Sequence, residues 1–287
     1  MSKKSRQAVK PAKVRDVFAA RPFAGLAAEA ELVALRELVP AATAPLKLTG
    51  DYAAKYGDRD ITLATVLPMA WPALTKPDGR IFIGLQRNER SGDINRDITV
   101  ALLNALETEP GATVSTPALP GEGPRLADVI VNEPLEITMH EGFDFWLDTD
   151  QERDEQVNAS LEAANAAIYP TVRMNSAHAA YWCRVPGKSH VRWVLPDAED
   201  KAMDALSRLS AAGHLKLGDD TKFAGMFRAH SLLVPVFDLP LEAEAATWEE
   251  PLSLLADRYA AAKTDEPLSP EERRAKQGLL GRQLALR

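Results

Sequence analysis

Residues 179–194, AAYWCRVPGKSHVRWV, carry the plainest structural signal in this chain. Two runs rich in apolar and aromatic residues flank Pro186-Gly187. Since proline presets one backbone dihedral and glycine tolerates positive φ, the stretch predicts a β-hairpin. A helix is expected to follow, from about Asp197 to a cap at Gly213, because apolar residues recur at helical spacing at positions 202, 206, 209 and 212. The stretch therefore predicts one unit of two strands and a helix.

The same order of two strands and an acid-opened helix recurs along the chain. Strand pairs are expected at 61–69 with 81–85, at 135–139 with 143–147, and at 215–217 with 232–237. Turns at 76–79 and 140–142 are expected to join the first two pairs. The helices of the four units are expected to begin near Asp93, Gln151, Asp197 and Trp248. Capping and the helix dipole account for acidic residues at those openings.

This pattern predicts the fold class. We expect an α+β protein in which repeated β-hairpin plus helix units form one or two antiparallel sheets covered by helices. Whether the units arose by internal duplication stays open, since their residues differ. A closed ring of such units, resembling the guanidine-modifying penteins, is the alternative. The chain shows neither the acid–histidine pattern of that family nor a cysteine in a C-terminal loop.

The chain divides into three regions. Residues 1–21 are expected to form a disordered basic arm, residues 22–265 the α+β body, and residues 266–287 a C-terminal helix or tail. The last helix is expected from a capping box at Ser269-Pro270-Glu271-Glu272. A loop rich in proline and glycine at 108–125 is long for a compact domain, so it is either a functional cover or a linker that subdivides the body.

Composition limits the class and compartment of the protein. Hydrophobic residues make up 46% of the chain and charged residues 26%, which is typical of soluble globular proteins. We expect no membrane span and no membrane partner, because no run of about 18 apolar residues is present. The lysine-rich N-terminus also lacks the apolar core of a signal peptide. Cys183 is the only cysteine, which excludes an internal disulfide and favours a cytoplasmic location.

Positive charge is concentrated at the two ends of the chain. Residues 1–15 carry a net charge of +6 and residues 269–287 carry +3. Because the whole chain carries −7, the span between them carries −16. An acidic body argues against a broad nucleic-acid surface, but a basic arm can contact phosphates. A solvated arm that only aids solubility would also explain the pattern.

The leading functional hypothesis follows from this charge distribution. We expect a non-enzymatic cytoplasmic binding protein that docks on RNA, or on a ribonucleoprotein such as the ribosome, through its basic arm. The residues expected to contact nucleic acid are Lys3, Lys4, Arg6, Lys10, Lys13 and Arg15. A purely structural or oligomer-forming module is a further alternative, and no cofactor or metal is expected.

A small-molecule, hydrolase-like enzyme is the competing hypothesis. Its candidate residues are His140, Glu141 and Asp144, in or beside the second predicted turn, where an imidazole and two carboxylates could move protons or bind a metal. A zinc-protease helix would require a second histidine where Asp144 stands. Turn chemistry alone also accounts for these residues, so the sequence leaves open whether the protein is an enzyme.

Two weaker patterns in the sequence point to catalysis and to phosphate binding. Cys183 with His178 and His190 could form a nucleophile and base, but Cys183 is expected in mid-strand, where a free cysteine behaves as a small buried hydrophobe. The segment 84–92, with Arg87 and Arg90 before a helix, could hold a phosphate. Capping of that helix by Asp93 is the better explanation, since its carboxylate would repel an anion.

Three strings give the chain a family resemblance. They are VPAATA at 39–44, ATVLPMAWPAL at 64–74 and HEGFDFW at 140–146. Together they resemble an uncharacterised family of actinobacterial cytoplasmic proteins, a domain of unknown function. The resemblance extends from about Pro22 to Tyr259. It implies a soluble intracellular protein and brings no activity, cofactor or catalytic residue with it.

Overall fold

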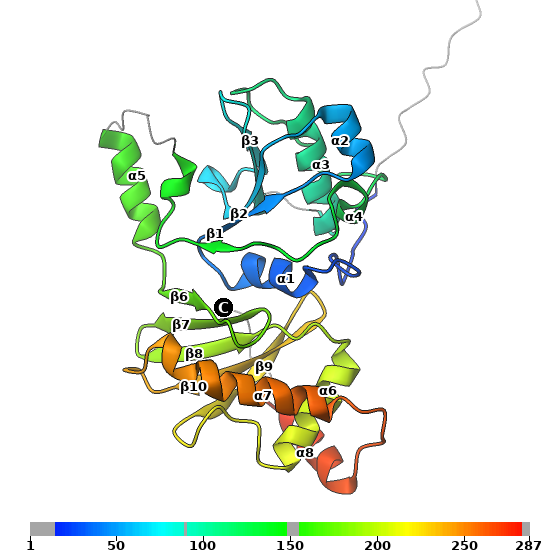
Figure 1. The fold of residues 1–287 in the computed structure, drawn as a ribbon, viewed down its shortest axis with the longest axis vertical. Helices are drawn as coiled ribbons and strands as arrows, with labels where there is room; N and C mark the ends of the chain where they lie inside the picture. Colours follow the sequence, from blue (N-terminus) through cyan, green and yellow to red (C-terminus); the bar gives the residue numbers. More distant parts are fainter. Residues whose placement is uncertain (1–14, 89–90, 148–154, 283–287) are drawn as a thin grey trace, which may run out of the picture.

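The computed structural model describes residues 15–88, 91–147 and 155–282. Two five-stranded sheets lie one above the other along the long axis of the molecule, and helix α1 (Glu29–Glu37) lies between them (Figure 1). We call the part built on the first sheet the first lobe, and the part built on the second sheet the second lobe. The chain completes the first sheet before it enters the second.

The first sheet has the strand order β3-β4-β2-β1-β5. Strands β2 and β4 run parallel, and the other neighbours are antiparallel. Helices α2 and α4 are short, and the longer α3 packs against β3 and β4 through a face that includes Ile98 and Leu102. The elements are β1 (Ala42–Leu46), α2 (Gly50–Tyr56), β2 (Ile61–Val66), β3 (Ala73–Thr75), β4 (Ile81–Gln86), α3 (Ile94–Glu107), α4 (Leu126–Val129) and β5 (Thr138–Met139).

The second sheet is antiparallel throughout and has the order β6-β7-β8-β10-β9. Helix α6 packs against β10 and against helices α7 and α8. Helix α5 (Glu155–Asn165) lies on the connection between the lobes. The remaining elements are β6 (Thr171–Arg173), β7 (Ala180–Val185), β8 (Lys188–Trp193), α6 (Glu199–Ala211), β9 (Lys222–Ala229), β10 (Leu232–Leu239), α7 (Glu249–Ala262) and α8 (Pro270–Leu280).

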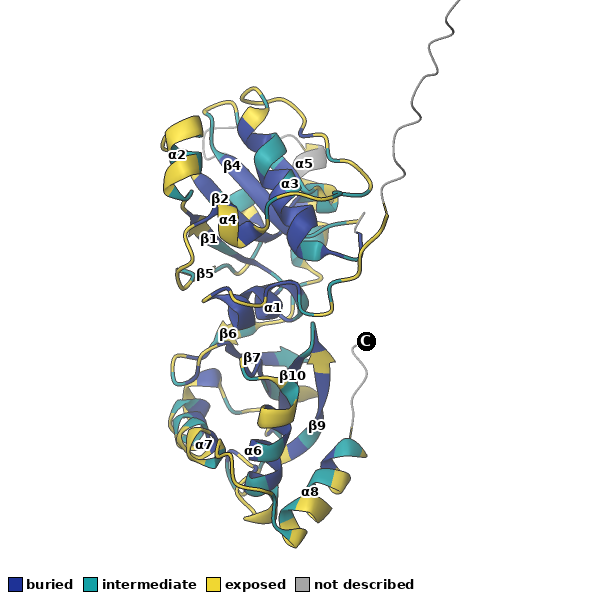
Figure 2. Ribbon diagram, turned by 90° about the vertical axis from the view of Figure 1, so that its right-hand side faces the viewer, coloured by how far each residue is buried: buried dark blue, intermediate teal, exposed yellow. Residues whose placement is uncertain are grey.

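Helix α1 joins the two lobes through one continuous core. Most of the helix is buried (Figure 2), with eight of its nine residues in the buried class. Its leucines share a hydrophobic cluster with Ile83 of the first sheet and Val234 of the second. Glu31 is 1% exposed and accepts hydrogen bonds from the Tyr181 hydroxyl at 2.5 Å and from Arg173 Nη2 at 2.7 Å. Burial, reinforced by this carboxylate, raises the pKa of Tyr181. A helix buried on both sides thus couples the lobes by apolar contacts and by charged groups such as Glu31.

The α+β class predicted from the sequence is confirmed. The hairpin over 179–194 is confirmed as β7 and β8, in a register that places Cys183 opposite His190. Asp93 and Trp248 are the N-caps of α3 and α7, as predicted, and α6 begins two residues beyond Asp197. The start predicted near Gln151 lies outside the described residues. The capping box before α8 is also confirmed.

Three predicted strand pairs differ from the structure. The turn at 76–79 joins β3 to β4. Strands β2 and β4 are direct neighbours in the sheet but run parallel, because β3 lies between them in the sequence, and they do not form a hairpin. The predicted hairpin around His140 is wrong. Only Thr138–Met139 is a strand, and it pairs with β1. Residues Asp144–Trp146 form a 3-10 turn because Phe143 and Trp146 stack on each other, with ring centroids 4.3 Å apart.

The fourth unit is also built differently. Residues 215–217 form no strand, and β10 pairs with β9. His230 and Ser231 make the turn of that hairpin with φ of 48° and 65°, and positive φ at both central residues is what a type I′ turn requires. Within the described residues, no helix has both the length and the apolar character needed to cross a membrane.

Candidate functional site

The root of the basic arm lies against the N-terminal end of α3. Asp16 Oδ1 accepts a hydrogen bond from the Gly92 amide at 2.7 Å, and the Ala19 amide donates to the Gly92 carbonyl at 2.9 Å. A Cβ at Gly92 would lie 2.8 Å from the Val17 carbonyl oxygen, closer than side-chain carbons come to backbone oxygens. The absence of a side chain at Gly92 therefore allows the arm root to pack directly on the backbone.

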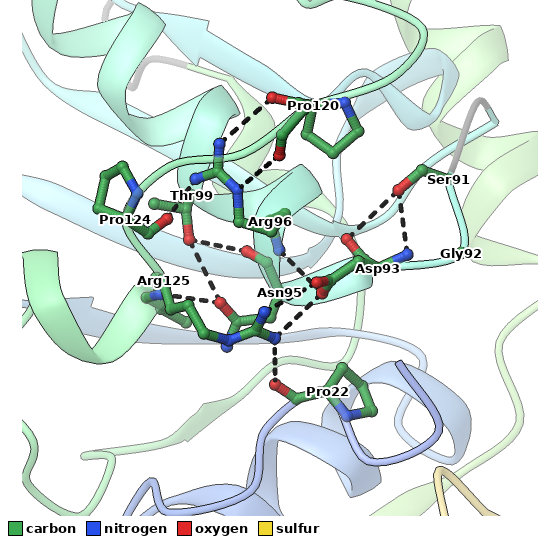
Figure 3. Close-up of polar contacts among 12 residues, drawn as sticks. Pro22, Ser91, Gly92, Asp93, Asn95, Arg96, Thr99, Pro120, Pro124 and Arg125 are labelled. Carbon is green, nitrogen blue, oxygen red and sulfur yellow. Dashed lines mark hydrogen bonds and ion pairs between the residues drawn. The ribbon is translucent and has the colours of Figure 1, made fainter. Parts of the chain in front are cut away.

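Asp93 organises the start of α3. Its carboxylate caps the helix by accepting from the Arg96 amide at 3.3 Å. The same carboxylate accepts two bonds from Arg125, with Nη1–Oδ2 at 2.8 Å and Nη2–Oδ1 at 3.1 Å (Figure 3). Arg125 also donates to the carbonyl of Pro22, where the arm enters the body, at 3.3 Å. Asp93 thus ties the helix, the following loop and the arm root together.

Arg96 holds the proline-rich loop. Although the residue is buried, its guanidinium donates to three loop carbonyls, those of Pro120, Gly121 and Pro124 (Figure 3). Gly123 has a φ of 155°, and a Cβ there would lie 2.6 Å from Arg96 Nη2. The end of the loop at 108–125 is therefore pinned to α3 of its own lobe.

These groups surround a cleft of about 710 Å³. Arg15 and the backbone of the arm root form one wall, and the start of α3 with loop residues 120–125 forms the other. Three arginines line the cleft together with three carboxylates, which belong to Asp16, Asp93 and Glu122. Because Arg96 and Arg125 are bound to carbonyls and to Asp93, the cleft is not a ready anion site, and the basic charge available there is that of the arm.

Of the six residues predicted to contact nucleic acid, the structure describes only Arg15. Arg15 is exposed at the mouth of this cleft. Lys3, Lys4, Arg6, Lys10 and Lys13 lie outside the described residues. For the phosphate hypothesis, Asp93 is confirmed as the cap, Arg87 donates to the Asp97 carbonyl at 3.0 Å, and Arg90 lies outside the described residues.

His140, Glu141 and Asp144 lie in the turn that follows β5. His140 Nε2 is 2.8 Å from the Thr43 hydroxyl, and its ring lies 4.7 Å from that of Phe145. Burial lowers the pKa of His140, which favours a neutral imidazole. The two carboxylate residues are exposed. The contacts of His140 join the turn to β1, which is a structural use of the imidazole.

Of the second set, Cys183 and His190 are brought together and His178 is not. Cys183 and His190 are direct cross-strand neighbours, and Asp238 follows His190 in the same row on β10. His190 Nδ1 and Asp238 Oδ1 are 2.9 Å apart. His178 lies instead beside Glu31, with Nδ1 3.6 Å from Oε1.

The environment of Cys183 does not favour a nucleophile. Burial raises the pKa of its thiol, and the nearby Arg192 opposes this only in part. A scarce thiolate is a poor nucleophile at neutral pH. Within residues 15–88, 91–147 and 155–282, no three side chains of histidine, cysteine, aspartate or glutamate lie close enough to hold a metal ion.

Sequence reasoning missed Glu31, Asp238 and the Asp93–Arg125 pair. Asp238 had a signal, since it is the single charged residue in the apolar run Leu232–Leu239. Glu31 had none, because its partner Arg173 is 142 positions away and an acid in the first turn of a helix is ordinary.

One comparison with known proteins gives a match. The model of a family described as "Family of unknown function (DUF5926)" matches residues 22–287. No curated protein and no solved structure matches the chain. The matched region contains both lobes, and residues 1–21 precede it. The chain belongs to this family, which confirms the predicted domain of unknown function.

Proposed function

We propose that this family member is a non-enzymatic cytoplasmic binding protein that docks on RNA, free or within a ribonucleoprotein such as the ribosome, through residues 1–15. The two lobes act as the carrier of that arm. The observation that carries the proposal is the attachment of a segment of charge +6 to a firmly held root at Gly92, on a body of opposite charge.

The charge distribution supports a contact confined to the arm. The span between the basic ends carries −16, so most of the body repels a polyanion. The arginines beside the root, Arg96 and Arg125, already donate to groups within the protein, so they have few donors left for a phosphate. Neutralising phosphates with the six basic residues of the arm releases condensed counterions, so binding is expected to weaken steeply with salt.

The competing enzyme has weaker support. A lowered pKa suits a general base, and His140 has one. However, His140 Nε2 is paired with Thr43 and the ring packs beside Phe145. These contacts account for the residue without a substrate.

Binding of the purified full chain to ribosomes and to free single-stranded RNA tests the proposal. Co-sedimentation measures binding to ribosomes and filter binding measures binding to free RNA, so the two assays show which of them the arm contacts. The matched variant replaces the six basic residues of the arm by glutamine and keeps its length. We expect it to lose binding in whichever assay the parent chain is positive. Binding that survives this change, or no binding of the parent chain at low salt in either assay, would refute the proposal.

A further inference from the structure

A second cleft, of about 360 Å³, lies between the two lobes. The end of α1 and the segment that follows it form an apolar wall that includes Leu38, Val39 and Pro40. Gln86, at the end of β4, and Arg192, on β8, supply polar groups from the two lobes. Clefts between lobes with an apolar wall and a few convergent polar groups are common sites for small ligands.

Arg192 is the residue in this cleft that requires explanation. It lies opposite Tyr181 and Val236 in the sheet, so its side chain emerges on the face that looks toward the first lobe. Among the described residues, no hydrogen bond or ion pair engages its guanidinium. By contrast, the buried Arg96 and the half-buried Arg173 are both bound. A partly buried cation without a partner is unfavourable, and an anion in the cleft would relieve this cost.

The other groups in the cleft limit the kind of anion. The planar guanidinium matches the two oxygens of a carboxylate, and the Gln86 amide can donate a further bond. Glu37 also lines the cleft, with His230 Nε2 2.7 Å from its carboxylate. This acidic group disfavours ligands of higher charge, such as phosphate. The apolar wall suits a ligand with an apolar body.

We propose that this interlobe cleft binds a small organic monocarboxylate, with its carboxylate on Arg192 and its apolar body against Leu38, Val39 and Pro40. This site is separate from the arm root and does not depend on RNA binding. The ligand would touch residues of both lobes.

Titration of the isotopically labelled full chain with benzoate and octanoate tests this site by NMR. We expect saturable shifts at the Gln86 side-chain amide and at Arg192 Nε for one or both carboxylates. Arg192→Gln should weaken binding by about tenfold or more, because a charge-assisted pair is lost. Arg184→Gln is the matched control, since Arg184 lies on the neighbouring strand but pairs with Glu244 at 3.0 Å. It should bind as the parent chain does.

Three results would overturn the proposal. The first is the absence of saturable shifts at the cleft with both carboxylates. The second is equal binding by the Arg192→Gln protein. The third is binding of inorganic phosphate as tightly as the carboxylates, which would show that the ligand class is wrong. If Arg192→Gln failed to fold, the location of the shifts in the parent chain would decide.

Discussion

Replacement of Gly92 by alanine should release the arm root while leaving both lobes folded. The new Cβ would lie 2.8 Å from the Val17 carbonyl oxygen and 3.0 Å from Phe18 Cα. Both atoms belong to backbone, so no flexible side chain can move aside. Either residues 16–19 or the start of α3 must shift, and the capped, buried start of α3 is the more firmly held of the two.

The size of the effect follows from the contacts that would be lost. The Gly92–Asp16 bond has a charged acceptor and is exposed, and the Ala19–Gly92 bond joins two backbone groups. Together they are expected to hold the root by about 2 kcal/mol against local opening. Loss of both would speed exchange of the Ala19 amide by about 30-fold. Global stability should change by less than about 1 kcal/mol, because the root buries little apolar surface.

Hydrogen exchange followed by NMR or mass spectrometry measures this directly. Gly50→Ala is the matched control, because a Cβ there meets nothing within 4 Å. Its exchange at Ala19 should equal that of the parent chain. If Gly92→Ala left exchange at Ala19 unchanged, the root would not be held as described. If it unfolded the first lobe, the assignment of the strain to the arm root would be wrong.

Three other substitutions probe the body. Glu31→Gln should lower the free energy of unfolding in urea by about 3 kcal/mol, because Arg173 and Tyr181 lose a buried carboxylate. The control Glu133→Gln removes an exposed carboxylate and should cost less than about 1 kcal/mol. A loss that small for Glu31→Gln would contradict a role in joining the lobes. Asp93→Ala should cost about 2 kcal/mol in the same assay through loss of the α3 cap and the Arg125 pair, and an unchanged midpoint would exclude that role. The lowered pKa of His140 contributes stability that is complete above the unfolded-state pKa of 6.5 and is lost as pH falls through the lower folded-state pKa. His140→Gln should therefore reduce the loss of unfolding free energy that occurs as the pH is lowered. If the variant and the parent chain showed the same dependence of unfolding free energy on pH, His140 would not be the source of that loss.

The sequence predicted those parts of the fold that depend on neighbours in the chain. The hairpin around Pro186-Gly187 and the cap at Asp93 follow from turn and capping chemistry, which act within a few residues. The strands β2 and β4 were found, but their parallel pairing was not, because the short β3 between them carries only a weak signal.

The turn at His140 shows why alternation can mislead. Phe143 and Phe145 alternate as in a strand, but their rings meet at a centroid distance of 6.1 Å within a compact turn. Aromatic residues that stack on one another in a turn can show the same alternation in sequence as aromatic residues on one face of a strand. Only the packing partners, which include Ala41 and Leu161, distinguish the two.

Of the candidate site, only the positive charge of the arm could be predicted from the sequence. The basic arm is plain in the sequence, but its attachment depends on Gly92, Asp16 and Arg125, which meet from three separate segments. The free guanidinium of Arg192 was equally hidden. An arginine in a strand is ordinary, and the absence of a partner among the residues that the structure describes is visible only once the first lobe is in place.

The salt dependence of RNA binding tests the central claim most directly. The full chain should bind single-stranded RNA with a slope of log affinity against log salt of about −4, and the affinity should fall by about 300-fold between 50 and 200 mM, as six neutralised phosphates require. A chain with the six basic arm residues changed to glutamine should show no measurable slope. A parent slope near zero, or the same slope in both proteins, would contradict docking through the arm.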